Sequence, residues 1–179
     1  MAKVKMCPHC GSKNITVAGT YYQCKDCTKD FGRPAISDEG KLLKECISDI
    51  RFRYGDVISG SVRAHFLQDG EQCVYEIYDS YGGGVDKVAD VMSMKEWESF
   101  KEALVDKLFV FDWSRVYYPA NDGRELRGNN EWELDILISD DEEYIFKGVD
   151  AYPAYWNAFL KLLDPYFDKL RKSKFKVLQ

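Results

Sequence analysis

Four cysteines near the N-terminus constrain the fold of this chain more than any other feature of its sequence. Cys7 and Cys10 form one Cys-x-x-Cys pair, Cys24 and Cys27 form a second, and thirteen residues separate the pairs. Each pair presents two thiolates from one tight turn, and two such turns facing each other supply the tetrahedral sulfur set that zinc prefers. We therefore predict a zinc ribbon in which these cysteines hold one structural Zn²⁺.

The residues around the cysteines indicate how this ribbon folds. Residues 15–23 hold two short apolar stretches around a Gly-containing turn, a pattern typical of a hairpin. Gly11 follows the first pair at a position that favours positive φ, whereas Thr28 takes the equivalent place after the second pair and should be strained there. Phe31 is expected to cover the apolar side of the site. His9 could replace a ligand, but we expect it on the surface.

Length and composition indicate how large the part of the chain outside the ribbon is and in which cellular compartment we expect the protein. The chain has 179 residues, of which 45% are apolar and 15% aromatic, enough for one ordinary domain with a sizeable core and a small module. It has no run of 18 apolar residues and no apolar segment near its start, so we predict a cytoplasmic protein without a membrane segment. In the cytosol, paired cysteines act as metal ligands more often than they form disulfides.

The positions of Pro and Gly, together with the hydrophobic periodicity, divide the chain into three predicted parts. Residues 1–33 form the ribbon, residues 34–47 a linker and a short helix, and residues 48–179 an α+β domain with a basic C-terminal tail. The linker is predicted because Pro and Gly interrupt a stretch that lacks any hydrophobic period. We expect few contacts to cross it.

Within the third part, period-two patterns predict strands and period-3.6 patterns predict helices. The strands are expected near residues 50–54, 62–67, 73–78, 87–92, 132–138 and 144–147. A capping box at 93–96 opens one helix, and Pro153 opens a second that Pro165 should end or kink. The order of these elements predicts the α+β class: an N-terminal zinc ribbon followed by an antiparallel sheet with two helices packed on one face.

Two stretches of this part are similar to a known family. The strand with Trp132 and Leu134, and the later run from Gly148 through Ala151-Tyr152-Pro153 to Trp156, fit a Trp-x-Leu strand and a Gly-x-x-Ala-Tyr-Pro-x-x-Trp helix start. Residues 48–168 thereby resemble a small uncharacterised domain of bacterial proteins, some of which carry an N-terminal zinc ribbon. The resemblance implies the fold and no chemistry. The ribbon also resembles four-cysteine ribbons of transposon and transcription-related proteins.

Charge is distributed unevenly along the chain. Residues 1–45 carry eight Lys/Arg and five Asp/Glu, a net of +3, whereas residues 46–168 carry twelve and 25, a net of −13. The last eleven residues carry five cations, which are Lys169, Arg171, Lys172, Lys174 and Lys176. An acidic body repels phosphate, so the ribbon and this tail are the predicted nucleic-acid contacts, and solvated charge is the alternative.

Other patterns offer weaker candidates. A possible interaction loop comprises Tyr81, Gly82, Gly83 and Gly84, because an aromatic beside flexible backbone suits adaptable contacts. No Lys-Ser/Thr pair follows, so it is not a phosphate loop. The acidic run at 140–143 is expected to be a turn rather than a cation site. Glu133 and Asp135 are expected on the wet side of the sheet.

The sequence offers few residues suited to acid–base or nucleophilic catalysis, since the chain has only two histidines. His65 is expected to face solvent, and we assign no catalytic residue. The four tryptophans are expected in the core. We therefore predict a non-enzymatic interaction or regulatory module with a protein partner. The alternatives are a nucleic-acid-binding accessory protein using ribbon and tail, and an enzyme with an unrecognised site.

Overall fold

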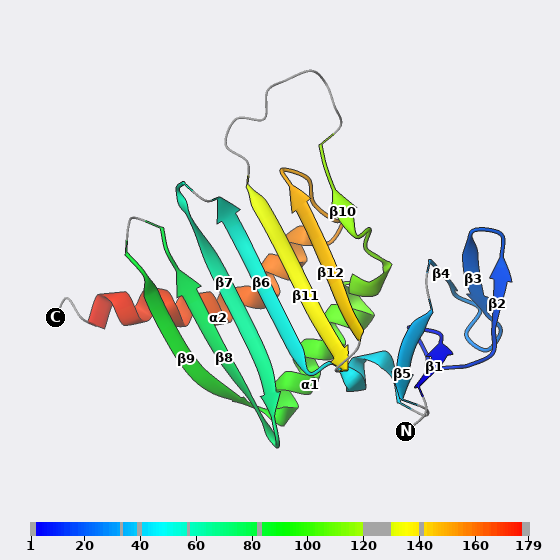
Figure 1. The fold of residues 1–179 in the computed structure, drawn as a ribbon. Coiled ribbons are helices and arrows are strands. Elements are labelled where there is room, and N and C mark those ends of the chain that lie inside the picture. The colour runs from blue at the N-terminus through cyan, green and yellow to red at the C-terminus, as the bar shows by residue number, and fades with distance from the viewer. Residues whose placement is uncertain are drawn as a thin grey trace.

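A seven-stranded sheet organises the body of the protein (Figure 1). The structure is a computed structural model that describes residues 3–32, 34–38, 41–56, 58–81, 84–119, 130–139 and 142–176. The sheet has the order β10-β12-β11-β6-β7-β8-β9. Its strands are β6 (Asp49–Asp56), β7 (Gly60–Asp69), β8 (Gln72–Asp79), β9 (Asp86–Ser93), β10 (Val116–Tyr117), β11 (Glu131–Ser139) and β12 (Glu142–Val149).

Strand pairing is antiparallel throughout this sheet except at one edge. The two-residue strand β10 runs parallel to β12, pairing Val116 with Lys147. Most of the longer strands alternate buried and accessible residues, as in β6, where Ile50 and Phe52 are buried and Arg51 between them is exposed. The period-two patterns therefore identified the six long strands correctly. Two residues are too few to show a period, so β10 was missed.

Two helices cover the buried face of the sheet, α1 (Met94–Glu102) and α2 (Trp156–Lys176). Phe66 of β7 contacts both, since its ring centroid lies 4.9 Å from that of Phe100 and 5.0 Å from that of Tyr166. Figure 1 shows both helices behind the sheet and none in front of it. The predicted class, an antiparallel α+β fold with two helices on one face, is confirmed.

The first helix begins at the predicted capping box, and its backbone changes conformation after Glu102. Ser93 and Glu96 form the expected capping box, with the Ser93 side chain accepting a hydrogen bond from the Glu96 amide. After Glu102 the chain widens into a π-helical segment, η2 (Ala103–Lys107), and then, past Phe109 at φ 51°, into a 3₁₀ turn, η3 (Val110–Asp112). This irregular path carries residues 109–115 toward the ribbon.

The second helix extends past Pro165, the proline at which the sequence predicted an end or a kink. Pro153 precedes the helix, which begins only at Trp156, and the helix does not end at Pro165 but continues to Lys176. Helical residues beyond the proline pack on the sheet: the Tyr166 ring lies 5.1 Å from that of Tyr75, and Leu170 is buried. These contacts outweigh the hydrogen bond that the proline removes.

The N-terminal part holds two small sheets. Strands β2 (Ile15–Ala18), β3 (Tyr21–Cys24) and β4 (Asp30–Phe31) form one, which confirms the predicted hairpin. Strands β1 (Lys3–Met6) and β5 (Ala35–Asp38) form the other. Thus the segment 34–47, predicted as linker and short helix, contains β5 and then a short 3₁₀ helix, η1 (Leu43–Cys46).

The four tryptophans lie in one large core, as expected. Trp97, Trp113, Trp132 and Trp156 are all buried, and the rings of Trp132 and Trp156 lie 4.8 Å apart. The Trp132 indole N–H donates to the Ala151 carbonyl oxygen at 2.8 Å, so its polar edge is satisfied. Among the described helices, none has the length and apolar composition needed to cross a membrane.

Candidate functional site

The four cysteines of the ribbon converge on one point. Cys7 follows β1, Cys24 ends β3, and the two Cys-x-x-Cys turns face each other. The Sγ atoms of Cys7 and Cys27 lie 3.7 Å apart, and those of Cys10 and Cys24 lie 3.6 Å apart. All four sulfur atoms lie within 4.8 Å of one another. This cluster could hold a metal ion, as the spacing of the cysteines predicts.

Backbone geometry at the two turns also follows the sequence. Gly11 has φ 71° and Thr28 has φ 61°, so the equivalent positions take the same left-handed conformation. For a threonine that conformation costs roughly 1–2 kcal/mol, which confirms the expected strain. Asp26 of the second turn accepts a hydrogen bond from the Asn14 side chain at 2.9 Å and another from Ser12. These bonds tie the second turn to the segment that follows the first.

Burial makes the cluster chemically unusual. Cys7 and Cys24 are buried together with Phe31, which covers the apolar side of the site as predicted. Burial raises the pKa of the Cys7 thiol above its ordinary value, and it raises that of Cys10 as well. A buried thiolate is unfavourable unless a cation compensates its charge. The donor set therefore fits a thiolate-binding metal ion.

The ribbon is docked on the body. His9 is only 11% exposed at its side chain, and its Nε2 lies 3.5 Å from Oδ1 of Asp112. The expectation that His9 lies on the surface is therefore wrong, since it fills the interface instead. From the other turn, the Lys29 ammonium lies 5.8 Å from the centre of the Phe109 ring. Met6, next to the first cysteine, is buried in the core of the body.

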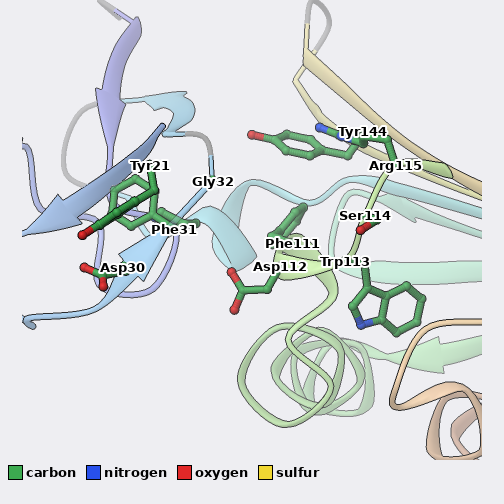
Figure 2. A pocket seen from close by; sticks show the side chains of 11 residues that line it. Tyr21, Asp30, Phe31, Gly32, Phe111, Asp112, Trp113, Ser114, Arg115 and Tyr144 are labelled. Carbon is green, nitrogen blue, oxygen red and sulfur yellow. The ribbon is translucent and has the colours of Figure 1, made fainter. Parts of the chain in front are cut away.

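Docking leaves a cleft of about 520 Å³ between the two units (Figure 2). The ribbon contributes Pro8, Tyr21, Asp30, Phe31 and Gly32. The body contributes Phe111, Asp112, Trp113, Ser114, Arg115 and Tyr144. Figure 2 shows the Asp112 carboxylate and the Tyr144 ring directed from the body toward the ribbon. No sequence pattern marks this cleft, because its walls come from separate segments that meet only when the ribbon docks.

A second cluster lies on the uncovered face of the sheet. Asp49, almost fully buried, places its two carboxylate oxygens 2.7 Å from Nη2 of Arg51 and 3.0 Å from Nε2 of His65. His65 was expected to face solvent, and on this open face it is instead half-buried against Asp49. The neighbouring strand adds Asp135, which pairs with Arg51 in register.

The carboxyl group of Asp135 is perturbed. Burial, followed by the negative charges of Glu133 and Glu143, raises its pKa to about 6. Its buried Oδ1 has no hydrogen-bond partner among the described residues. With Arg53, Arg63 and other residues it lines a hollow of about 300 Å³. The expectation that this strand face is simply wet missed this environment, because cross-strand neighbours are not visible in a single sequence.

The other predicted residues lie apart from these sites. Tyr81 is half-exposed, and Gly84 is exposed, while Gly82 and Gly83 lie outside the described residues. In the tail, Lys169 is bound to Asp90, with 2.8 Å between Nζ and Oδ2, and it also donates to the Tyr75 hydroxyl. Arg171 pairs with Asp168 on its own helix at 2.8 Å. The backbone of Lys172, Lys174 and Lys176 continues α2, but their side chains lie outside the described part.

Comparison with family models, curated proteins and solved structures finds no match to this chain. The resemblance of residues 48–168 to a small bacterial domain therefore stays a prediction. The structure therefore offers three candidate sites: the cysteine cluster, the ribbon–body cleft and the polar hollow on the open sheet face. The first of these is suited to holding a metal ion, and the other two are suited to contacts with a partner or ligand.

Proposed function

We propose that the cysteine cluster holds one structural Zn²⁺. A tetrahedron of sulfur atoms at about 2.3 Å from a central zinc has edges of about 3.8 Å. The two Sγ–Sγ separations of 3.6 and 3.7 Å support this arrangement. Four thiolates leave no open coordination position, so the ion would stabilise the ribbon rather than activate a substrate.

We further propose that the protein is a non-enzymatic interaction module with a protein partner. The observation that carries this proposal is the docked ribbon, which forms a cleft of about 520 Å³ with the body. Clefts between units are favoured binding places because each unit supplies a wall. The role of the metal would be to keep the ribbon folded, and so to keep one wall of the cleft in place.

Affinity capture from the native cell tests this function. The zinc-loaded chain is used as bait, with one sample treated with nuclease and one bait carrying Cys24→Ser. A protein recovered by the first bait after nuclease treatment, and lost with Cys24→Ser, is the expected result. Recovery of nucleic acid alone, or of nothing, would contradict the interaction function.

The open sheet face supports a second candidate, an enzyme. The hollow holds a carboxyl group with its pKa raised to about 6 and, on the other side of Arg51, a histidine that contacts a buried aspartate. Groups of these two kinds are used for proton transfer. A panel of chromogenic esters, phosphate esters and glycosides provides the test. Turnover that both Asp135→Asn and His65→Gln abolish, with the fold retained, would favour the enzyme. Turnover that survives either change would exclude this cluster as its source.

A further inference from the structure

The cleft between the ribbon and the body has a specific chemical character. We propose that it receives an arginine or lysine side chain from an extended segment of a protein partner. This assignment rests on the interaction function proposed above and specifies what that partner presents. It follows from the charges, the rings and the volume of the cleft.

Carboxylates stand on both sides of the cleft. Asp30 belongs to the ribbon and Asp112 to the body, where its side chain is 39% exposed although His9 contacts it. Figure 2 shows Asp30 on the ribbon and Asp112 on the body, with the Asp112 carboxylate directed toward the ribbon. An anionic ligand would be repelled by both, and a neutral ligand would remove water from them without replacing their hydrogen bonds. A cation in the cleft is attracted by both carboxylates.

Aromatic rings fill much of the remaining wall. Tyr21 of the ribbon is 44% exposed, and the partly buried Phe111 lies on the opposite side. Rings of this kind attract a cation over their faces and shield the alkyl part of a long side chain. Combined with the carboxylates, they match a side chain that has an apolar stem and a charged end, as Lys and Arg have.

The protein already uses this mode of contact beside the cleft. The guanidinium carbon of Arg115 lies 4.3 Å from the Tyr144 ring centre and 4.8 Å from that of Phe146. Arg115 is the one cation among the described lining residues, and it is stacked on these rings. The volume of about 520 Å³ exceeds that of one side chain, which leaves room for the backbone on either side of it. This favours a peptide segment over a free amine.

Short peptides test the assignment on the full zinc-loaded chain. The probes are acetylated, amidated Ala-Arg-Ala and Ala-Lys-Ala, with Ala-Gln-Ala and Ala-Glu-Ala as neutral and acidic matches. Amide shifts in a ¹H–¹⁵N titration report both affinity and place. We expect the basic peptides to bind at least tenfold more tightly than the others, with the shifts centred on Gly32, Asp112 and Ser114. Equal binding of all four peptides, or shifts centred elsewhere, would overturn the assignment.

Variants of the carboxylates complete the experiment. Asp30→Asn and Asp112→Asn should each weaken the binding of Ala-Arg-Ala several-fold, and together by roughly tenfold or more, since each removes one negative charge from the lining of the cleft. Asp69→Asn, at an exposed aspartate that ends β7 and does not line the cleft, is the matched control and should change nothing. Because Asp112 also contacts His9, Asp30→Asn is the variant that tests charge without disturbing docking.

The double variant also separates this assignment from the interaction function. Used as bait in the capture experiment, it should lose the protein that the unchanged chain recovers. If that protein is still captured in full, the interaction function stands and the cleft is not where the partner binds. If neither bait captures a protein, the interaction function itself fails.

Discussion

The ribbon and the body reach stability by different means. In the described part of the chain, the ribbon buries three apolar residues in a cluster of its own, whereas the core of the body buries 28. Fixing each residue costs on the order of 1–2 kcal/mol of backbone entropy. A cluster as small as Cys7, Cys24 and Phe31 cannot offset that cost, so the ribbon depends on an added link between its two turns, which the proposed metal ion would supply.

The boundary between these two means of stabilisation is sharp in sequence. Met6 packs in the core of the body, while Cys7 beside it belongs to the ribbon cluster. Strand β1, which ends at Met6, also pairs with β5, the strand that follows the ribbon in the sequence. Both ends of the ribbon are thus anchored to the body. The comparison predicts that losing the metal unfolds the segment between the anchors and leaves the anchors themselves in place.

The largest expected effect is therefore metal loss. The protein should contain one zinc per chain, and binding should contribute about 10–16 kcal/mol to ribbon folding at neutral pH. Cys24→Ser should abolish zinc retention and collapse the amide signals of residues 7–32, with those of the body unchanged. Elemental analysis and ¹H–¹⁵N spectra measure both. Cys46→Ser, outside the cluster, is the control and should keep its zinc.

Two outcomes would contradict this difference between the ribbon and the body. Protein purified without chelator that contains no metal would remove the proposed source of ribbon stability. Collapse of the body signals in Cys24→Ser would show that the two units fold as one, and that the small cluster and the large core are not separate.

The next effect concerns the body. Trp156 is buried at the start of α2, where its ring contacts Trp132 and lies 5.9 Å from that of Phe52. Trp156→Ala should lower the free energy of unfolding of the body by roughly 3–5 kcal/mol while the zinc content stays at one per chain. Denaturant titration followed by far-UV circular dichroism measures the loss. Tyr118→Ala, at an exposed tyrosine, should cost little, and wild-type stability of the Trp156 variant would place that ring outside the core.

Sequence patterns predicted some features of the ribbon and the body and missed others. The cysteine spacing located the cysteine cluster because four sulfur ligands at fixed intervals leave little choice of geometry. Hydrophobic periods located six strands and the start of α1, because each buried face repeats locally. The end of α1, the docking of His9 and the position of Asp135 against Arg51 depend on contacts between distant segments. Such contacts leave no period, so the cleft and the polar hollow emerged only from the folded chain.

The stabilities of the body and of the ribbon should respond to pH in opposite directions, which a pH titration measures. The folded pKa of Asp135, about 6, lies above its ordinary value, so the folded body binds this proton more tightly than the unfolded chain does. Its contribution is complete below the ordinary pKa and is lost as pH rises through about 6. Between pH 5 and pH 7 this group should therefore lower the stability of the body by about 1 kcal/mol.

The ribbon should show the reverse, because protons compete with zinc for the thiolates and weaken its folding as pH falls. Chemical denaturation at several pH values, followed separately by signals of the ribbon and of the body, measures both slopes. Asp135→Asn should flatten the slope of the body, and Asp164→Asn, at an exposed position, should not. A body slope that persists in Asp135→Asn would assign the effect to another group.

The smallest expected effect concerns nucleic acid, which the acidic body should repel and the basic ends could attract. Binding to duplex DNA should be weak and sequence-tolerant, with a slope of log K against log salt near −4 for about four or five neutralised phosphates. Lys169 is already bound to Asp90, so the change that tests the tail replaces Arg171, Lys172, Lys174 and Lys176 by Gln. That variant keeps Leu170, which a truncation would remove from the core.

Most of the salt slope should disappear in this fourfold variant, and the ribbon lysines would carry the remainder. Lys161→Gln, at an exposed lysine on the same helix, should leave the slope unchanged. Fluorescence anisotropy of a labelled duplex at several salt concentrations measures it. Tight binding that survives both the variant and moderate salt would mean that the body itself contacts the bases. The contrast in charge between the acidic body and the basic ends would then not explain how this protein binds nucleic acid.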